Sequence, residues 1–323
     1  MIRWGIVGPG KIANKFADAI KNVEGAELIA VASRLKERGQ EFADKHNVPM
    51  VFESYEKMSE SSDVDAVYVA TPHPFHKSCA ELFLNAKKHV LCEKPVCVNE
   101  VEAVELMEYA KNNGVFLMEA MWTRFLPAIN ETLKIVQSGE IGDIRGVKAD
   151  FCYSMPYNAQ SRVYNPDLAG GALLDVGVYC LNFAAIFLGD EVEDIISMSD
   201  VNYGVDCQTN VLLKYSNGRI ASLSSAVNVR KPNTGYIYGT KGFISLPNFY
   251  AAQEIIVNVN NSERRILKPF MGNGFEEEII EACSCIRDGK MQSNIMPMKE
   301  SIRIMKQMDL IRNQIGLRYP FEL

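Results

Sequence analysis

Residues 2–13 of the chain read IRWGIVGPGKIA, and this stretch decides the fold that we expect. Its first half is an apolar run typical of a buried strand, and a helix is expected to begin near Lys11. The turn between them, Gly8 to Ala13, has the pattern Gly-x-Gly-x-x-Ala. In this setting Gly8 permits the tight turn, Gly10 lets the backbone approach a pyrophosphate, and Ala13 keeps the helix close to the strand. Together with the N–H groups of the helix start, the stretch predicts a dinucleotide site.

Strand-like and helix-like segments continue to alternate outward from this stretch, to about residue 120. Strands separated by helices are typical of a parallel sheet with right-handed crossovers. We therefore expect residues 1–120 to form a doubly wound Rossmann domain. The apolar runs that predict its strands are 3–8, 28–32, 66–71, 88–92 and 115–119.

After Met121 the chain changes from alternating elements to strands in succession. Short strands without intervening helices are expected from 192 to 267. This order predicts a second, α+β domain, residues 121–323, on a largely antiparallel sheet, in a chain of the α/β class. The last helix is a candidate to pack back on the first domain. The other expected elements are a helix at about 125–138, a strand at 145–153, an apolar helix at 173–188 and two closing helices near 275–288 and 298–315.

The composition argues against several classes of protein. The chain has 323 residues, 47% of them hydrophobic, and a net charge of −6. Without clustered Lys and Arg it is not expected to bind nucleic acid or an acidic membrane. We find no apolar run of about 18 residues, so no transmembrane helix is expected. The eight cysteines lie mostly in apolar segments without Cys-x-x-Cys spacing, which predicts reduced, buried thiols, a cytoplasmic location and no structural metal.

The end of the second strand indicates which dinucleotide to expect. An NAD site usually has an acidic residue there, which holds the ribose 2′-hydroxyl. Here the strand at 28–32 ends in Ser33-Arg34, with Arg38 a few residues beyond. A guanidinium is suited to pair with a 2′-phosphate. We therefore expect NADP, with NAD as the alternative, although a solvated basic helix start would explain the same residues.

Two further motifs follow strands of the first domain. Thr71-Pro72-His73-Pro74-Phe75-His76 comes at the end of the run at 66–71, and Glu93-Lys94-Pro95 follows the run at 88–92. Ligands of an open parallel sheet bind at the carboxyl ends of its strands. We therefore expect His76 near the nicotinamide and Lys94 near the cofactor or a reacting hydroxyl, whereas a surface loop would account for His73. The candidate cofactor residues are Gly8, Gly10, Lys11, Ile12, Ala13, Ser33, Arg34, Arg38, Thr71, Pro72, His73, His76, Glu93 and Lys94.

A polar pair interrupts the apolar helix of the second domain. Asp175 and Tyr179 are four residues apart, so both are expected on one helical face. Burying an acid and a phenol is costly unless they are paired or catalytic. A buried Asp–Tyr hydrogen-bond pair is the structural alternative. A neighbouring ammonium, such as that of Lys94, would lower the pKa of the phenol towards the working range and make it a usable base.

Together these motifs resemble those of the Gfo/Idh/MocA oxidoreductases, and the resemblance covers the whole chain. Many members have histidine where Tyr179 stands. This tyrosine, with segments 119–125, 32–34 and 315–320, looks most like the branch of dimeric dihydrodiol dehydrogenases and NADP-dependent D-xylose dehydrogenases. The motifs that carry the resemblance are Gly8-x-Gly10-x-x-Ala13, Thr71-Pro72 through His76, Glu93-Lys94-Pro95 and Asp175-x-Gly177-x-Tyr179.

The resemblance implies an NADP-dependent oxidoreductase that transfers hydride between the nicotinamide and a secondary hydroxyl of a sugar, polyol or cyclic diol. It implies Tyr179 as the acid/base, Lys94 as its helper and Asp175 as the residue that orients the substrate or the tyrosine. In this family the outer face of the second domain's sheet commonly forms a dimer interface, which implies a homodimer or a higher homo-oligomer. The substrate-side residues would be Trp122, Arg124, Phe151, Asp175 and Tyr179, with a core position as the plainer interpretation of Phe151.

Two alternatives stay open from the sequence. A relative that binds a dinucleotide without catalysis would be a sensing regulator, an interpretation that the presence of Lys94 and Tyr179 disfavours. An enzyme that keeps NADP(H) bound and exchanges hydride between two sugars would carry the same motifs. The sequence does not identify the substrate.

Overall fold

The chain folds as two compact units in this computed structural model, which describes residues 1–189 and 191–322. The first unit contains Met1–Trp122 and Met271–Ile302, and the second contains Thr123–Phe270 and the chain from Arg303 onward. Residues 271–302, which the sequence analysis placed in the second domain, thus lie in the first unit. The reason is local packing, since Phe275 stacks on Trp122 in the first unit. The domain boundary near residue 120 stays a prediction.

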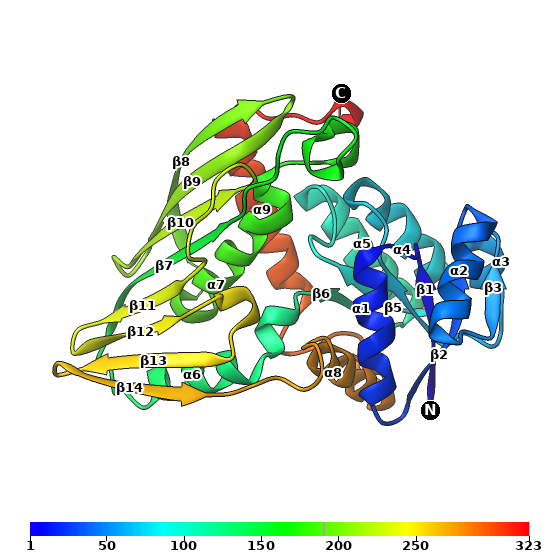
Figure 1. Ribbon diagram of the computed structural model, residues 1–323, viewed down its shortest axis with the longest axis horizontal. Helices are drawn as coiled ribbons and strands as arrows, with labels where there is room; N and C mark the ends of the chain where they lie inside the picture. The colour runs from blue at the N-terminus through cyan, green and yellow to red at the C-terminus, as the bar shows by residue number, and fades with distance from the viewer. Residues whose placement is uncertain (190, 323) are drawn as a thin grey trace. The chain divides into compact units, whose positions relative to one another are not determined.

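The first unit is built on a six-stranded parallel sheet with the order β3-β2-β1-β4-β5-β6 (Figure 1). The chain runs outward from β1 to β3 and then returns to β4, beside β1, so the order reverses between these two strands. Doubly wound sheets bind ligands at this switch point. The prediction of a Rossmann fold is confirmed. The strands are β1 Ile2–Val7, β2 Ala26–Ala32, β3 Met50–Phe52, β4 Ala66–Val69, β5 His89–Glu93 and β6 Leu117–Ala120, and the helices are α1 Lys11–Ala19, α2 Lys36–His46, α3 Tyr55–Ser59, α4 His76–Asn85, α5 Glu100–Asn113 and α8 Glu276–Arg287.

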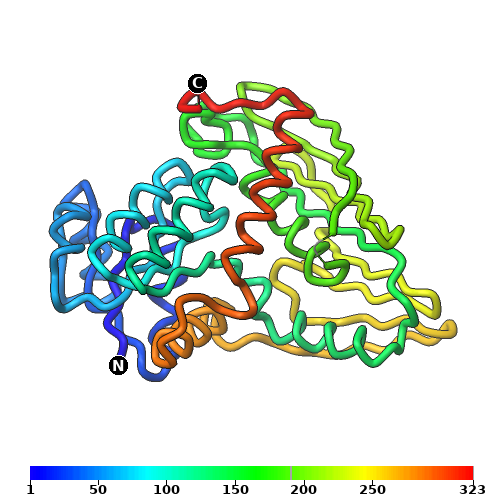
Figure 2. The backbone as a smooth tube through the Cα atoms, turned by 180° about the vertical axis from the view of Figure 1, so that it is seen from behind, coloured from blue at the N-terminus to red at the C-terminus, as the bar shows by residue number. Residues whose placement is uncertain are grey.

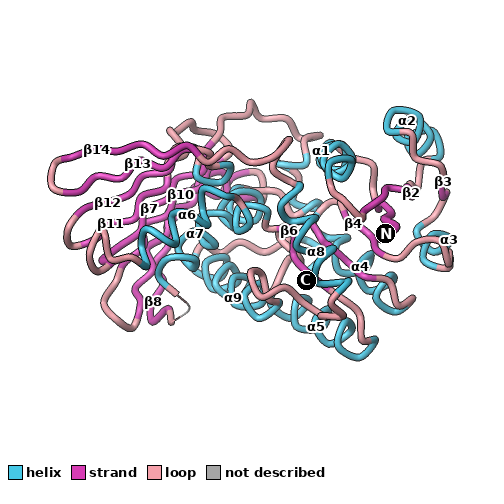
Figure 3. The backbone as a smooth tube through the Cα atoms, turned by 90° about the horizontal axis from the view of Figure 1, so that it is seen from below, coloured by secondary structure: helices cyan, strands magenta, loops and turns pink. Residues whose placement is uncertain are grey.

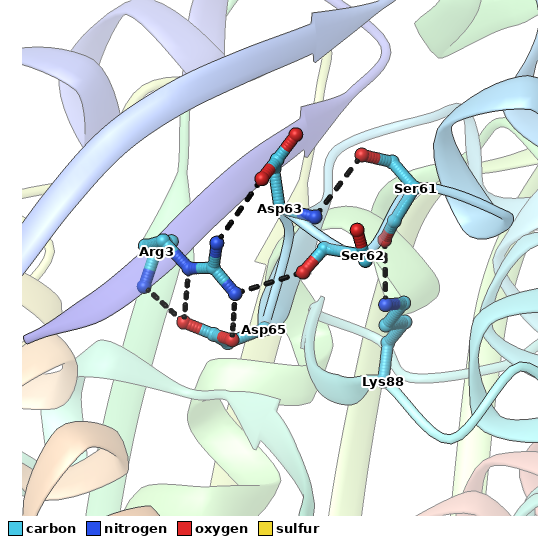
Figure 4. Close-up of polar contacts among 6 residues, drawn as sticks. All are labelled: Arg3, Ser61, Ser62, Asp63, Asp65 and Lys88. Atoms are coloured by element: carbon cyan, nitrogen blue, oxygen red, sulfur yellow. Dashed lines mark hydrogen bonds and ion pairs between the residues drawn. The ribbon is translucent and has the colours of Figure 1, made fainter.

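A polar network around Arg3 ties β1 to the residues that lead into β4 (Figure 4). The Arg3 guanidinium donates to both carboxylate oxygens of Asp65, at 3.0 and 2.8 Å, and to the Ser62 carbonyl at 2.8 Å. Partial burial would raise the pKa of Asp65, but the hydrogen bonds and charge of Arg3 lower it. This network lies at the amino ends of the strands, so it leaves the carboxyl ends to the ligand.

The second unit is built on an eight-stranded sheet with the order β14-β13-β12-β11-β7-β10-β9-β8, coloured magenta in Figure 3. Only β7 and β10 pair in parallel among the described strand pairs of this sheet, so the largely antiparallel sheet is confirmed. Helix α7 lies against one face (Figure 1), where Val147 and Ala149 are buried. The strands are β7 Ile144–Cys152, β8 Val192–Asn202, β9 Val205–Tyr215, β10 Ile220–Ala226, β11 Gly235–Gly239, β12 Gly242–Leu246, β13 Glu254–Val259 and β14 Ser262–Leu267, and the helices are α6 Pro127–Gln137, α7 Val178–Leu188 and α9 Met298–Gln314, which begins in the first unit.

The apolar helix predicted at 173–188 starts as a π-turn, Leu173–Gly177, and continues as α7. Among the described residues one helical stretch, Pro166–Leu188, is long and apolar enough to cross a membrane by length and composition, with a mean hydropathy of 1.8. The sequence analysis missed it because glycines and polar side chains interrupt the run. Since 94% of its most apolar window is buried inside the protein, the stretch packs as a core helix does.

All eight cysteines are free and buried. Burial raises the pKa of Cys79 to about 11 and that of Cys285 to about 12, so these thiols are protonated core side chains at neutral pH. Within residues 1–189 and 191–322, no group of three or more His, Cys, Asp or Glu side chains is arranged to hold a metal ion.

Candidate functional site

The glycine-rich turn lies at the switch point of the first sheet. Gly8 has a φ of +88°, and a Cβ there would lie 3.2 Å from Thr71 Cγ2, so the loops after β1 and β4 are in close contact. At Gly10 the nearest atom to a Cβ would be 4.0 Å away, which leaves space beside the backbone. Among the described side chains none caps α1, and its first turn holds no acid. A pyrophosphate fits a helix start of this kind.

Basic side chains follow β2, as the sequence predicts for an NADP site. Arg34 is exposed, and its guanidinium lies 5.3 Å from the centre of the Phe75 ring, in the loop after β4. Ser33 is buried beside it, and Arg38 is exposed on α2. Arg34 therefore stands at the carboxyl edge of the sheet, between two loops that border the switch point. Its chemistry suits a phosphate.

His76 joins two of the loops at this edge. Its Nδ1 lies 2.8 Å from the carbonyl oxygen of Pro95, and its Nε2 lies 2.7 Å from that of Thr71. The side chain is buried, and its ring meets that of His73 edge-on, with centroids 5.7 Å apart. Pro72 continues this loop after Thr71. These contacts favour a structural role for His76, and its expected contact with the nicotinamide stays a prediction.

Glu93 and Lys94 stand at the end of β5. Glu93 is buried, with Oε1 accepting a hydrogen bond from the Tyr68 hydroxyl and Oε2 accepting one from the Lys94 N–H at 3.1 Å. Burial raises the pKa of Glu93, although the Lys94 ammonium acts to lower it. Lys94 is half-buried and is followed by a cis peptide bond to Pro95. Glu93 therefore anchors the backbone from which the Lys94 side chain extends at the ligand-binding edge.

In the second unit, Asp175 lies in the π-turn with both carboxylate oxygens engaged. Oδ2 accepts from the Tyr153 hydroxyl at 2.7 Å, and Oδ1 lies 3.0 Å from Nη2 of Arg162. Burial, followed by the Asp175 charge, raises the pKa of Tyr153, so this phenol stays a hydrogen-bond donor. The sequence offered a buried hydrogen-bond pair of Asp175 with Tyr179 as the structural alternative, and that pair stays a prediction. The contacts described here join Asp175 to Tyr153, which directly follows β7. Asp175 is held as a charged, oriented acceptor.

Tyr179, in the first turn of α7, lies among aromatic rings. Its ring meets Phe151 edge-on at a centroid distance of 5.3 Å and Tyr250 at 6.2 Å. Phe151 stacks on Tyr250 at 3.9 Å. We call these three rings the aromatic wall. Apolar rings beside a few polar groups are typical of small-molecule sites.

The two remaining candidates fall in different units. Trp122 belongs to the first unit, where its ring stacks on Phe275 with centroids 5.2 Å apart. Arg124 is buried in the second unit, and its Nε donates to Asn182 Oδ1 on α7 at 2.8 Å. Packing therefore accounts for both positions, and their contact with a substrate stays a prediction.

Sequence reasoning missed Tyr153, Tyr250 and Phe275 and assigned no role to Arg162. Tyr153 had a usable signal, because residues two apart on a strand share a face and Phe151 was a candidate. Arg162 and Tyr250 lie in the short 3-10 turns η4 Arg162–Tyr164 and η7 Phe249–Ala251. No sequence periodicity marks where a side chain points in such turns.

A doubly wound parallel sheet with an open glycine turn at its switch point, followed by an α+β unit, defines a dinucleotide-binding protein of two units. Comparison with known families identifies which family of dinucleotide-binding proteins the chain belongs to. Residues 2–121 match the family model for an oxidoreductase family with an NAD-binding Rossmann fold, and residues 129–245 match that for the GFO/IDH/MocA C-terminal domain. The chain therefore belongs to the Gfo/Idh/MocA family and is an oxidoreductase, which confirms the resemblance seen in the sequence.

Individual relatives cover nearly the whole chain. The trans-1,2-dihydrobenzene-1,2-diol dehydrogenase of Mus musculus is 35% identical over 331 residues, which span 99% of this chain and 98% of the relative. The crystal structure of KijD10, a 3-ketoreductase from Actinomadura kijaniata, in complex with NADP and TDP-benzene has a TM-score of 0.89 and 26% identity, covering 97% of this chain and 98% of that chain. An aldose-aldose oxidoreductase from Caulobacter crescentus complexed with glycerol has a TM-score of 0.90 at 24% identity, over 98% and 97% of the two chains, and so shares the fold.

Proposed function

We propose that the protein is an NADP-dependent dehydrogenase that oxidises a secondary hydroxyl of a cyclic diol, a sugar or a related polyol. The observation that carries the proposal is that the second unit holds both the aromatic wall and the fixed Asp175 carboxylate, which would offer a ring-shaped substrate an apolar surface and an acceptor for its hydroxyls. The dihydrodiol dehydrogenase at 35% identity supports this substrate class. The 3-ketoreductase that was crystallised with NADP supports the cofactor.

The reaction removes a hydride from carbon and a proton from the hydroxyl oxygen. When bound, NADP supplies the acceptor for the hydride. We assign the proton to the Tyr179 phenolate, with the Lys94 ammonium stabilising its negative charge. Each carboxylate oxygen of Asp175 can accept more than one hydrogen bond, so its carboxylate can also orient a substrate hydroxyl. In the reverse direction Tyr179 returns the proton.

Two features of a relative agree with this assignment. Structures of KijD10 have been solved for a variant with one tyrosine replaced by phenylalanine and for another with one lysine replaced by alanine. These are the residue types to which we assign the proton transfer here. We place the pyrophosphate at residues 8–13 and the 2′-phosphate at Ser33, Arg34 and Arg38.

A substrate screen with both cofactors tests the proposal. The purified protein would be assayed by nicotinamide absorbance against trans-dihydrodiols, aldoses and inositols, with NADP and NAD compared. We expect turnover of at least one diol or sugar, faster with NADP at limiting cofactor. No turnover across the panel would contradict the proposal. Nicotinamide retained through gel filtration, with turnover only when a second sugar is added, would favour the hydride-exchanging alternative.

We also propose that the protein is a homodimer that pairs through the sheet face opposite α7. Large exposed apolar patches mark interaction sites in soluble proteins. The exposed apolar side chains of this outer face are Ile196, Met198, Leu212, Ile220, Tyr238 and Phe243.

The cytoplasmic location stays a prediction from the buried thiols.

A further inference from the structure

The backbone that leads into the π-turn is held by a buried acid from β9. Asp206 is fully buried, and its Oδ2 accepts from the Leu173 N–H and from the Thr209 hydroxyl, each at 2.7 Å. Leu173 is the first residue of the π-turn that contains Asp175. Asp206 therefore fixes the point from which that turn starts, although it lies 31 positions after Asp175 in the sequence.

The backbone just before the π-turn is also held by the C-terminal tail. The hydroxyl of Tyr319 donates to the carbonyl oxygen of Gly170 at 2.8 Å. Figures 1 and 2 both show the red tail beside the green loop that contains this residue. The tail is itself anchored, since Arg312 pairs with Glu322 at 2.6 Å and with Asp309 at 2.7 Å. Gly170 is thus hydrogen-bonded to a segment that is itself held by two ion pairs.

Gly171 leaves no room between the turn and the acid. Its φ of +111° lies in the region that favours glycine, and a Cβ there would be 2.1 Å from Asp206 Oδ1. The backbone of the turn therefore rests directly against the carboxyl group.

We propose that Asp206 is a positioning residue of the dehydrogenase reaction, which sets the directions of Asp175 and Tyr179 by holding the backbone from Gly171 to Leu173. The inference rests on the proposed function, because it assigns a purpose to the placement of those two side chains. The π-turn fits this role, since π-turns are rare and are frequently found at functional sites. Asp206 touches neither Asp175 nor Tyr179 in the contacts described above, so its effect is indirect.

The ionisation of Asp206 provides an independent signature. Burial raises the pKa of Asp206 to about 7, although the bonds from Thr209 and Leu173 act to lower it. The titratable groups that face it are Cys207 on its own strand and Tyr319 from the tail. The pKa of Asp206 is higher when its carboxyl group is packed against the backbone of residues 171–173 than when it is exposed to water, so the packed state binds the proton more tightly. The packed state is therefore most stable at low pH and becomes less stable as the pH rises towards 7.

Kinetics of three variants test the positioning role. Asp206→Ala removes the acceptor, and we expect kcat to fall about 10- to 100-fold with the KM for NADP unchanged, because misplaced reacting groups lower the rate of the chemical step. Asp206→Asn keeps an oxygen for the Leu173 N–H and should restore most of the rate. Asp194→Asn, an exposed acid on β8, is the matched control. An unchanged kcat in folded Asp206→Ala, or no rescue by Asp206→Asn, would overturn the proposal.

Hydrogen exchange of the Leu173 amide tests the positioning role of Asp206 without any substrate, and therefore independently of the proposed function. After correction for the intrinsic rate, its protection in the wild type should fall about tenfold per pH unit between about pH 5 and pH 7 and should be flat in Asp206→Asn. If Asp206→Ala does not fold, Tyr319→Phe replaces it and should lower both the protection and kcat. Protection that does not depend on pH in the wild type would overturn the proposal, whether or not a substrate is found. Failure of the substrate screen alone would overturn the proposed function.

Discussion

Asp175 is held by two residues outside its own helix, Tyr153 directly after β7 and Arg162 in η4. Arg162→Ala removes the charge that faces this buried carboxylate, and a hydrogen bond to a charged group contributes about 1.5–3 kcal/mol. We expect kcat/KM for the diol or sugar to fall about 10- to 100-fold, with the KM for NADP unchanged. Arg162→Lys should recover part of the loss. Steady-state kinetics with each substrate varied in turn measure both effects, and a loss confined to NADP would contradict this role.

Replacing Arg34 tests the expected preference for NADP over NAD. Arg34 is exposed at the end of β2, and the nearby Lys36 pairs with Glu53 at 2.9 Å. Arg34→Ala should therefore raise the KM for NADP about tenfold or more and leave that for NAD almost unchanged, because only NADP carries the 2′-phosphate. Lys36→Ala is the matched control and should change neither. Equal losses for both cofactors would argue against a 2′-phosphate contact.

Alanine substitutions at two glycines distinguish the cost of backbone strain from the cost of steric crowding. Gly171 and Gly189 flank the π-turn and α7, and both have positive φ, +111° and +88°. A Cβ at Gly171 would lie 2.1 Å from Asp206 Oδ1, whereas at Gly189 it would meet nothing within 4 Å of the described atoms. Alanine at Gly189 should therefore cost only the backbone strain, on the order of 1–3 kcal/mol, and alanine at Gly171 clearly more. Thermal melts of both variants measure the difference, and equal losses of Tm would contradict it.

Elements with a strong local pattern could be predicted from the sequence. The alternation of apolar runs and amphipathic stretches identified five of the six parallel strands, but β3 has only three residues and no usable period. In the second unit the pattern marks separate strands at 210–215, 220–229, 235–238, 243–246 and 254–259, but not β8 or β14. Apolar residues of β8 face solvent, as Ile196 and Met198 show, and β14 is an edge strand rich in charge. Such strands do not show the expected alternation.

The candidate site residues likewise fall into those that a local sequence pattern predicts and those that it does not. Gly8 to Ala13 and Glu93-Lys94 stand at ends of regular elements, where the sequence pattern itself marks the edge of the sheet. Contacts between distant elements, such as Tyr153 with Asp175 and Asp206 with Leu173, have no local signature. They depend on strand order and register, which one sequence does not specify.

Three buried acids make the stability of the protein depend on pH. Glu278 is fully buried, and neither carboxyl oxygen has a hydrogen-bond partner among the described residues. Burial and then the charge of Glu93 raise the pKa of Glu278 well above its usual range, and burial also raises the pKa of Glu93 and, to about 7, that of Asp206. Through these three acids the folded state binds more protons than the unfolded state, and their contribution to stability falls as the pH rises through the window from about 4 to 7.

Glu278→Gln should reduce this dependence, because the amide cannot ionise. We expect a shallower decline of the unfolding free energy between about pH 5 and pH 7, and stability at least equal to the wild type above that range. Denaturant unfolding at a series of pH values measures it. Glu24→Gln, at an exposed position of the same unit, is the control and should leave the slope unchanged. A steeper decline in Glu278→Gln would contradict the account.

The proposed dimer can be tested through the outer face of the second sheet. Leu212 is 48% exposed there, and a lysine at this position would place a charge in the interface. Leu212→Lys should shift the sedimentation coefficient from dimer to monomer. Met291→Lys, at a position equally exposed in the first unit, should not. A dimer that persists in Leu212→Lys would place the interface elsewhere.

Hydride transfer by Tyr179→Phe is the most direct test of the central assignment. The change removes only the hydroxyl that accepts the substrate proton, so kcat should fall about 100-fold or more while NADP binding, measured by fluorescence titration, is unchanged. Tyr109→Phe, a tyrosine on α5 outside both sites, is the matched control and should retain full activity. If Tyr179→Phe transferred hydride at the wild-type rate with saturating substrate, the assignment of Tyr179 as the acid/base would be wrong.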